Sequence, residues 1–506
     1  MTPSTKTSLF RLSFALAATI VAGPLAARAA VPGIQGPSFK LVASAGFTSQ
    51  PDGASIYSWG YGCDSQSAAP AFVPFGGSCP EMQLPGPTLI VHEGDQVTVT
   101  LRNKLPAAAG STSIIFPGFT VSTVSGDSGT AGLITAEASS GGGTVTYTFV
   151  ADRPGTFAYY SGTQPDLQIE MGLYGALIVL PTTTPQGCAQ GPYSLAASAY
   201  ENAASCYDRE YMFQISEMDS RVHDQALAQV NACPVGPCAP IRVTLEPYRP
   251  NYFLLNGRSL PDDMDVSYAP NYPAQPYNCN PHIHPGEKLL MRIIGQGRWQ
   301  HPFHFHGNHA RVLARDGNLL VSAIDGTSLA GPLLFTTPTV SGQSQDQIFT
   351  WSGKGLNWDV YNHRKNDGQC SPDPVTHTTY SQADGTCACI PDASGYHSIK
   401  TDPNYGEWCA DHKKPIPVTP PDPNIVAIGQ WYGGTPYLGI QPTGSGSSFT
   451  TTNEPPGTLN QNPQAGYAYM WHSHNEREIT TNDVFPGGIM TMLLVDPPLY
   501  QIDETR

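Results

Sequence analysis

The stretch His301-Pro302-Phe303-His304-Phe305-His306-Gly307 places three histidines among apolar residues. In a β-strand, successive side chains alternate between the two faces with a period of two residues. His304 and His306 would therefore share one face, and His301 would point to the other. The stretch predicts a strand that presents a pair of imidazoles on one side.

A second histidine pair occurs near the C-terminus, in Trp471-His472-Ser473-His474. As a strand, this segment also places His472 and His474 on one face, with Ser473 opposite. Neutral imidazole is the commonest metal ligand in proteins and suits copper, zinc and iron. We therefore predict that the two strands come together and that their four imidazoles form a metal site.

The composition favours an all-β chain. There are 51 glycines and 48 prolines, and only 13% of the residues are charged, which is typical of many short strands joined by turns. A mass of 54.0 kDa suffices for two or three domains with full cores. The net charge of −15 argues against nucleic acid or an anionic membrane surface as a partner.

Strand-like segments fall into two sets that predict two domains, 31–186 and 187–506. The first set comprises 84–103, 113–121, 143–150, 155–160 and 175–180, whereas 31–80 shows few strand signals. The second set comprises 210–216, 251–258, 284–293, 301–307, 347–351 and 467–496. A polar insertion at about 355–425 interrupts the second set. Residues 187–280 are weakly patterned, so a separate third domain stays open as an alternative.

The first 30 residues are typical of a general secretory signal peptide. Lys6 and Arg11 give a basic start, residues 12–25 are apolar, and Ala27-Arg28-Ala29 is a small-x-small cleavage site. We find no later run of about 18 apolar residues, so no transmembrane segment is expected in the mature chain. These features predict a secreted or periplasmic protein.

Eleven cysteines in an exported chain predict disulfides with at least one thiol left over. Cys63 with Cys79 and Cys233 with Cys238 are candidate local pairs. Four further cysteines lie in the insertion, and a soft-metal site is the alternative to disulfides for two of them, Cys387 and Cys389.

These residues resemble the multicopper oxidase family, whose members are strings of Greek-key cupredoxin β-barrels. The stretch 301–307 matches the family's HPxHxHG motif, and 84–103 is similar to its opening strand pair. Residues 253–258 are similar to its LLNGR strand, and the segment 471–474 stands where the family has His-Cys-His. The resemblance implies an all-β fold of tandem cupredoxin-like Greek-key barrels or sandwiches.

The first domain departs from the family pattern, which implies eight histidines around a trinuclear copper cluster. The first histidine pair should follow Ile114, where this chain has Ile115-Phe116, and the second should fall near Tyr159-Tyr160-Ser161-Gly162. None of the four expected imidazoles is present there. We expect Tyr159 and Tyr160 to fill the vacated space, with a redox tyrosine as the alternative.

The family's type 1 copper site is also altered. Ser473 stands in place of the cysteine ligand and Glu478 in place of the second histidine, while Met490 is the nearest counterpart of the axial methionine. A serine hydroxyl is a poor copper ligand compared with a thiolate. His301 keeps its position without its partners, so we predict that no type 1 centre forms.

The resulting hypothesis is a secreted multicopper-oxidase-like protein, of oxidoreductase type, that binds fewer than four copper ions between its domains. The substrate would be a small molecule or a metal ion, and no organic cofactor or catalytic residue is assigned. The predicted ligands are His304, His306, His472 and His474, with His301, Glu476, Glu478 and Met490 as secondary candidates.

Two alternatives stay open from the sequence. Manganese or iron would be favoured over copper if the strand continues beyond His474, because Glu476 and Glu478 would then join its face. The other alternative is a catalytically inactive cupredoxin scaffold. Such a protein would bind or deliver metal, or would dock into an extracellular or envelope electron-transfer assembly.

Overall fold

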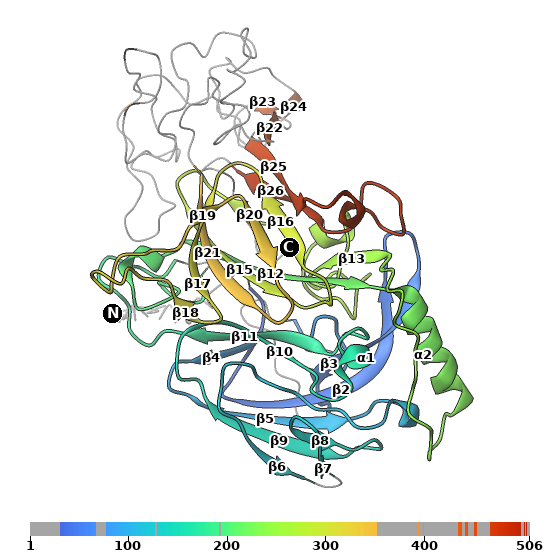
Figure 1. Ribbon diagram of the computed structural model, residues 1–506. Coiled ribbons are helices and arrows are strands. Elements are labelled where there is room, and N and C mark those ends of the chain that lie inside the picture. The colour runs from blue at the N-terminus through green and yellow to red at the C-terminus, as the bar shows by residue number, and fades with distance from the viewer. Residues whose placement is uncertain are drawn as a thin grey trace, which may run out of the picture.

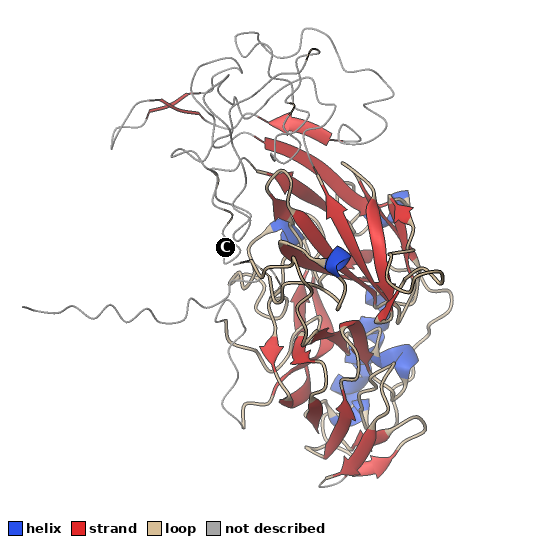
Figure 2. Ribbon diagram, turned by 90° about the vertical axis from the view of Figure 1, so that its left-hand side faces the viewer, coloured by secondary structure: helices blue, strands red, loops and turns tan. Residues whose placement is uncertain are grey.

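The structure, a computed structural model, describes residues 31–66, 77–126, 129–191, 194–351 and 466–496, with short pieces at 393, 398, 434–437, 441–443, 450–452, 500 and 502. Strands dominate these residues, as predicted from the composition (Figure 2). The predicted signal segment 1–30 lies outside the described residues, as does nearly all of the insertion with Cys370, Cys387, Cys389 and Cys409.

Residues 34–180 form what we call the first β unit, which contains two main sheets (Figure 1). One sheet has the order β3-β2-β5-β9-β6: Ser55–Cys63, Ser38–Ser49, Gln96–Asn103, Thr144–Val150 and Ser122–Ser125. The other has the order β1-β4-β11-β10: Ile34–Gln35, Leu89–His92, Tyr174–Leu180 and Gly155–Tyr160. Short elements complete the unit: η1 (Ala107–Ala109), the pair β7 (Gly129–Ala131) and β8 (Ala136–Ala138), and α1 (Pro165–Gln168).

Residues 209–495 form the second β unit, which lies above the first in Figure 1. Its larger sheet follows the path β13-β12-β15-β21-β17-β18: Tyr252–Leu255, Arg209–Met218, Lys288–Gly295, Ser344–Thr350, Ala310–Arg315 and Asn318–Leu319. A seventh strand, β19 (Leu333–Leu334), pairs with β17. The connections include η2 (Ala203–Ser205), α2 (Ser220–Ala232) and η3 (Asp262–Met264).

The smaller sheet of the second unit carries both histidine pairs. Its path is β14-β26-β25-β16-β20: His282–Ile283, Met490–Val495, Gly466–Ser473, His301–Phe305 and Thr336–Thr339. A sixth strand, β22 (Gly434–Tyr437), pairs with β25, and η5 (Glu476–Ile479) follows β25. A separate two-stranded pair is formed by β23 (Gln441–Thr443) and β24 (Thr450–Thr452).

The core of the second unit lies between its two sheets and is aromatic. Phe303 and Trp471 of the six-stranded sheet pack on Phe213 of the seven-stranded sheet, with ring centroids 5.4 and 5.8 Å away. Phe349 lies 5.1 Å from Trp471 and extends the same cluster. Burial of these side chains fixes the inner face of β16 and β25, and alternate residues must therefore lie on the outer face.

The two units pack through the seven-stranded sheet and through loops. Ala158 and Ile178 of the first unit share an apolar cluster with Met212 and Ile294 of the second. Beside that cluster, the buried Asp346 carboxylate accepts a hydrogen bond of 2.6 Å from the Thr156 hydroxyl.

Several elements differ from the sequence prediction. Residues 38–63, where few strand signals were found, contain the long strands β2 and β3. Strand β3 was not predicted because it is buried on both faces, so its sequence does not alternate between polar and apolar residues. The expected strand at 113–121 is irregular and has only isolated bridges, at Thr112 and Ile115. Helix α2 was not predicted; the side chain of Asp219 accepts from the Arg221 amide at its N-terminus.

Among the described cysteines, the two predicted disulfides, Cys63–Cys79 and Cys233–Cys238, are present. A third, Cys188–Cys206, was not predicted. Cys279 is a free, buried thiol. Within the described part of the chain, no helix is long and apolar enough to cross a membrane.

Candidate metal centre

Pairing of β16 with β25 brings the two histidine segments together. The strands are antiparallel, and His304 lies directly opposite His472. Their neighbours Phe303, Phe305 and Trp471 point into the aromatic core, so the pleat turns His304 and His472 to the outer face. The predicted strand pairing is therefore present.

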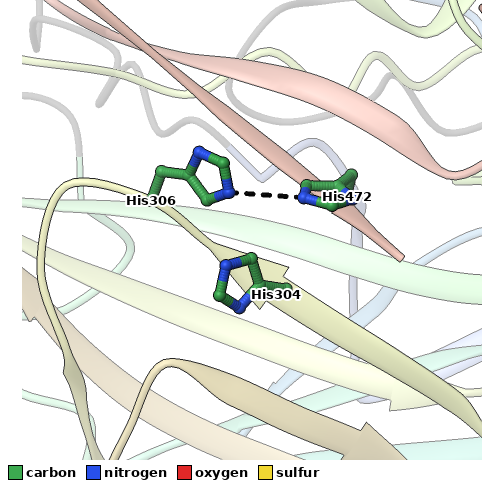
Figure 3. A group of neighbouring side chains, drawn as sticks. All are labelled: His304, His306 and His472. Atoms are coloured by element: carbon green, nitrogen blue, oxygen red, sulfur yellow. Dashed lines mark hydrogen bonds between the residues drawn. The ribbon is translucent and has the colours of Figure 1, made fainter. Parts of the chain in front are cut away.

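Three imidazoles converge on that face. His304, His306 and His472 each offer one ring nitrogen, and these atoms all lie within 4.8 Å of one another (Figure 3). The Nε2 atoms of His306 and His472 are 3.3 Å apart. We call these three residues the imidazole cluster.

The outer nitrogens of the cluster have fixed partners. Nδ1 of His472 donates to the Ser473 carbonyl oxygen at 2.7 Å, and Nδ1 of His304 is hydrogen-bonded to the Thr336 hydroxyl at 2.7 Å. Such contacts orient a ring and leave the other nitrogen of His472, Nε2, as an acceptor. Nε2 of His472 accepts a hydrogen bond from Nε2 of His306. A metal ion bound between these two nitrogens would take the place of the proton that they share.

Burial, and after it the charge repulsion of the neighbouring imidazoles, lower the pKa of His304 to about 4. Burial and the adjacent imidazoles also lower the pKa of His472 to about 4, although the hydrogen bond to Ser473 opposes the change. Both rings are therefore neutral near pH 7, which is the form that binds metals. The donor set fits one copper ion with positions left for water.

His474 lies beside the cluster and is exposed, because β25 ends at Ser473. Its ring centroid is 5.0 Å from that of His304 and 5.6 Å from that of His472. It is not one of the three residues with converging nitrogens. A change of its rotamer would be needed for a fourth imidazole ligand.

The cluster does not lie between the two β units, and that expectation was wrong. All three nitrogens come from β16, the turn after it and β25, which belong to the second unit. They lie on the outer face of the six-stranded sheet, whereas the apolar packing between the units involves Met212 and Ile294 of the seven-stranded sheet. The aromatic core separates the two locations.

His301 points to the inner face, as predicted, and is held between two carboxylates. Its Nδ1 lies 2.8 Å from Oε2 of Glu478, and its Nε2 lies 2.8 Å from Oε2 of Glu217. All three side chains are buried. A metal ligand role for His301 would require one of these carboxylates to be displaced.

The hydrogen bonds around the two carboxylates favour a proton on both nitrogens of His301. Glu478 accepts from Ser473 and Asn475, and Glu217 accepts from the backbone amides of residues 298 and 299. Burial would lower the pKa of His301, but the hydrogen bonds to Glu217 and Glu478 raise it to about 9. An imidazolium thus stands beside Ser473, the residue that the family resemblance implies in place of the type 1 cysteine.

The secondary candidates Glu476, Glu478 and Met490 do not join a type 1 site or extend the histidine face of β25. The strand does not continue past Ser473; the short helix η5 follows, which leaves Glu476 exposed and turns Glu478 inward onto His301. Met490 lies opposite His472 on β26, so it shares the face of the imidazole cluster and not that of Ser473. Glu217, which comes from β12, could not be found from the sequence because nothing in its local pattern indicates His301.

Tyr159 and Tyr160 lie where the first-unit histidines would be expected. Tyr159 is fully buried, and its hydroxyl donates to the Pro87 carbonyl at 2.7 Å. Burial raises its pKa well above the ordinary value. Tyr160 forms a bridge with Ile115, and the space is occupied by packed side chains.

Comparison with known proteins identifies one matching family. The multicopper oxidase profile matches residues 80–184. L-ascorbate oxidase of Cucurbita pepo var. melopepo is 30% identical over 249 residues, covering 47% of this chain and 39% of that protein. Copper-containing nitrite reductase of Pseudomonas chlororaphis is 36% identical over 129 residues, covering 24% of this chain and 32% of that protein. The matches thus span less than half the length of these relatives.

Solved structures give weaker similarities. A multicopper oxidase named mgLAC is 16% identical, with a TM-score of 0.45, and the match covers 92% of this chain and 87% of that one. A blue copper oxidase from Nitrosomonas europaea is 14% identical, with a TM-score of 0.44, and the match covers 90% and 85% of the two chains.

Proposed function

We propose that this chain is a cupredoxin-type member of the multicopper oxidase family and that it is a secreted, copper-binding protein of oxidoreductase type. It holds fewer copper ions than the four of the family pattern and has no type 1 centre. The observation that carries the proposal is the convergence of the ring nitrogens of His304, His306 and His472 within 4.8 Å.

The imidazole cluster supplies the metal ligands. His472 offers Nε2, because its Nδ1 is engaged by the Ser473 carbonyl, and His304 is held by Thr336. When bound there, copper would supply one-electron redox chemistry. Because His306 is only half-buried and His474 is exposed, the cluster has a solvent-facing side through which a reductant could approach.

Absence of a type 1 centre is supported by the environment of His301. Both of its nitrogens are engaged by carboxylates, and Ser473 donates to Glu478 where a thiolate would be required. Electrons would have to reach the cluster directly from the substrate or from a partner protein that docks near it.

The test is redox cycling of copper in the full chain. Protein loaded with Cu²⁺ is reduced anaerobically with ascorbate and then exposed to air, and the EPR signal is followed. We expect the signal to disappear and return in the wild type and in His309→Gln, whose ring lies outside the cluster. In His304→Gln/His306→Gln, the bound Cu²⁺ signal should be absent. A wild type that binds no copper, or whose copper cannot be reduced, would contradict the proposal.

A further inference from the structure

Three methionines adjoin the imidazole cluster on the same face of the six-stranded sheet. On the antiparallel pair β25–β26, His472 lies directly opposite Met490, and Met470 lies directly opposite Met492. These four residues form a two-by-two block, because 470 and 472 are alternate residues of one strand and 490 and 492 of the next.

The alternation of both strands supports this placement. Tyr469, Trp471 and Leu493 belong to the buried core between the sheets, so the intervening residues of β25 and β26 lie on the opposite, outer face. Directly opposed side chains have Cβ atoms about 4.5–5.5 Å apart. Their sulfur and nitrogen atoms are therefore within reach of one shared ion.

The block is continuous with the cluster. The backbone amide of His306 donates to the Met470 carbonyl at 3.3 Å, and His472 belongs to both groups. Met490 is 5% exposed, and Met470 and Met492 are half-buried, so the thioethers are shielded but not sealed in the core.

The methionines are confined to the positions nearest the imidazoles. The next outward positions along the two strands are Ala468 and Leu494, which lie opposite each other. Flexible methionines often serve only as packing. Packing alone, however, gives no reason for three of the chain's 10 methionines to stand beside His472 while ordinary aliphatic residues follow.

Thioether sulfur is a soft ligand that selects Cu⁺ over hard cations. We propose that Met470, Met490 and Met492 form a binding site for a cuprous ion next to the imidazole cluster, with Nε2 of His472 as its nitrogen ligand when the cluster holds no Cu²⁺. The outer face of the six-stranded sheet would then bind copper in its monovalent form. The inference rests on the proposed copper-dependent function and names the oxidation state and the ligands.

Copper K-edge X-ray absorption on the full chain, loaded anaerobically with Cu⁺, tests the inference without any substitution. We expect sulfur in the first coordination shell together with imidazole nitrogen. A first shell that contains nitrogen or oxygen only would overturn the proposal, and this result does not depend on whether a variant folds.

A variant series measures the contribution of the sulfurs. In Met470→Leu/Met490→Leu/Met492→Leu, side-chain volume is nearly kept, and Cu⁺ affinity in competition with bicinchoninate should fall about tenfold or more. The matched control, Met212→Leu/Met218→Leu/Met291→Leu, changes three buried methionines of the seven-stranded sheet and should leave Cu⁺ affinity unchanged. Equal affinities in the two triple variants would overturn the proposal.

Failure of the methionine site and failure of the proposed function give different experimental results. If Cu²⁺ binds and cycles but Cu⁺ shows no sulfur ligand, the methionine site falls and the imidazole site stands. If Cu⁺ shows sulfur ligation that Met470→Leu/Met490→Leu/Met492→Leu loses, but the cluster does not hold Cu²⁺, the methionine site stands and the oxidoreductase proposal falls.

Discussion

The Nδ1 atom of His301 lies 2.8 Å from Oε2 of Glu478, a carboxylate oxygen that also accepts a hydrogen bond from the Ser473 hydroxyl. With Glu217 on the other ring nitrogen, a proton on His301 provides the positive charge between two buried carboxylates. The second β unit therefore holds a buried cationic centre beside Ser473.

Replacement of Glu478 by Gln tests the charge on His301. The pKa of His301 is about 9 in the folded chain, above its ordinary value of 6.5. Protonation therefore stabilises the fold fully below pH 6.5, and this contribution is lost as the pH rises through 9. We expect Glu478→Gln to lower the free energy of unfolding by about 3 kcal/mol at pH 6 and to flatten its decline between pH 6.5 and 9.

Urea denaturation at a series of pH values measures this effect. Glu476→Gln is the matched control, because Glu476 is exposed on the same short helix. It should change the profile little. A Glu478→Gln profile that follows the wild type across the whole pH range would contradict the assignment of an imidazolium.

Ser473→Cys/Glu478→His should convert the His301 site into a copper site. The double variant would place one thiolate and two imidazoles together, which is the donor set of blue-copper centres. Met490 lies on the other face and would not supply an axial ligand. We expect copper to produce a strong visible absorption in the double variant but not in the wild type or in Ser473→Cys alone. A colourless copper-loaded double variant would show that the side chains are not arranged as described.

Asp346→Asn should weaken the packing between the two units. The buried Asp346 carboxylate accepts from the Thr156 hydroxyl and amide and from the Tyr200 hydroxyl, and it lies 3.8 Å from Arg292. Loss of its charge should lower the free energy of unfolding by about 3 kcal/mol, read from thermal and urea denaturation. Asp152→Asn, which breaks an exposed ion pair with Arg153, should have little effect. Equal changes in the two variants would argue against this interface.

The metal-free imidazole cluster should resist protonation. Because burial and mutual repulsion lower the pKa values of His304 and His472 to about 4, their rings should stay neutral down to about pH 5. Imidazole NMR resonances followed against pH measure this directly. Titration of both rings near pH 6.5 would mean that the cluster is open to water.

The features that could be predicted from the sequence are those that depend on the local periodicity of a strand. The alternation in 301–307 and 471–474 was enough to place His304 and His472 on one face and His301 on the other, and the structure pairs these strands. The all-β class and two of the three described disulfides followed from composition and spacing. Strand β3 was missed because a strand buried on both faces does not alternate, and its partner β2 has no regular alternation along most of its length.

What the sequence did not predict depends on long-range pairing and on strand ends. Glu217 reaches His301 from a strand 84 residues away, and no local pattern indicates such a contact. The direction of Met490 follows from its register with His472, and the inward turn of Glu478 follows from the end of β25 at Ser473. Both require the folded sheet.

Copper content per chain tests most directly whether the imidazole cluster binds copper. The full chain would be produced in copper-supplemented medium beside His304→Ala/His472→Ala, with the metal in each protein measured per chain. We predict bound, non-blue Cu²⁺ in the wild type and its loss in the double variant, with folding of both checked by circular dichroism. A metal-free wild type, or equal copper in the two proteins, would contradict the account.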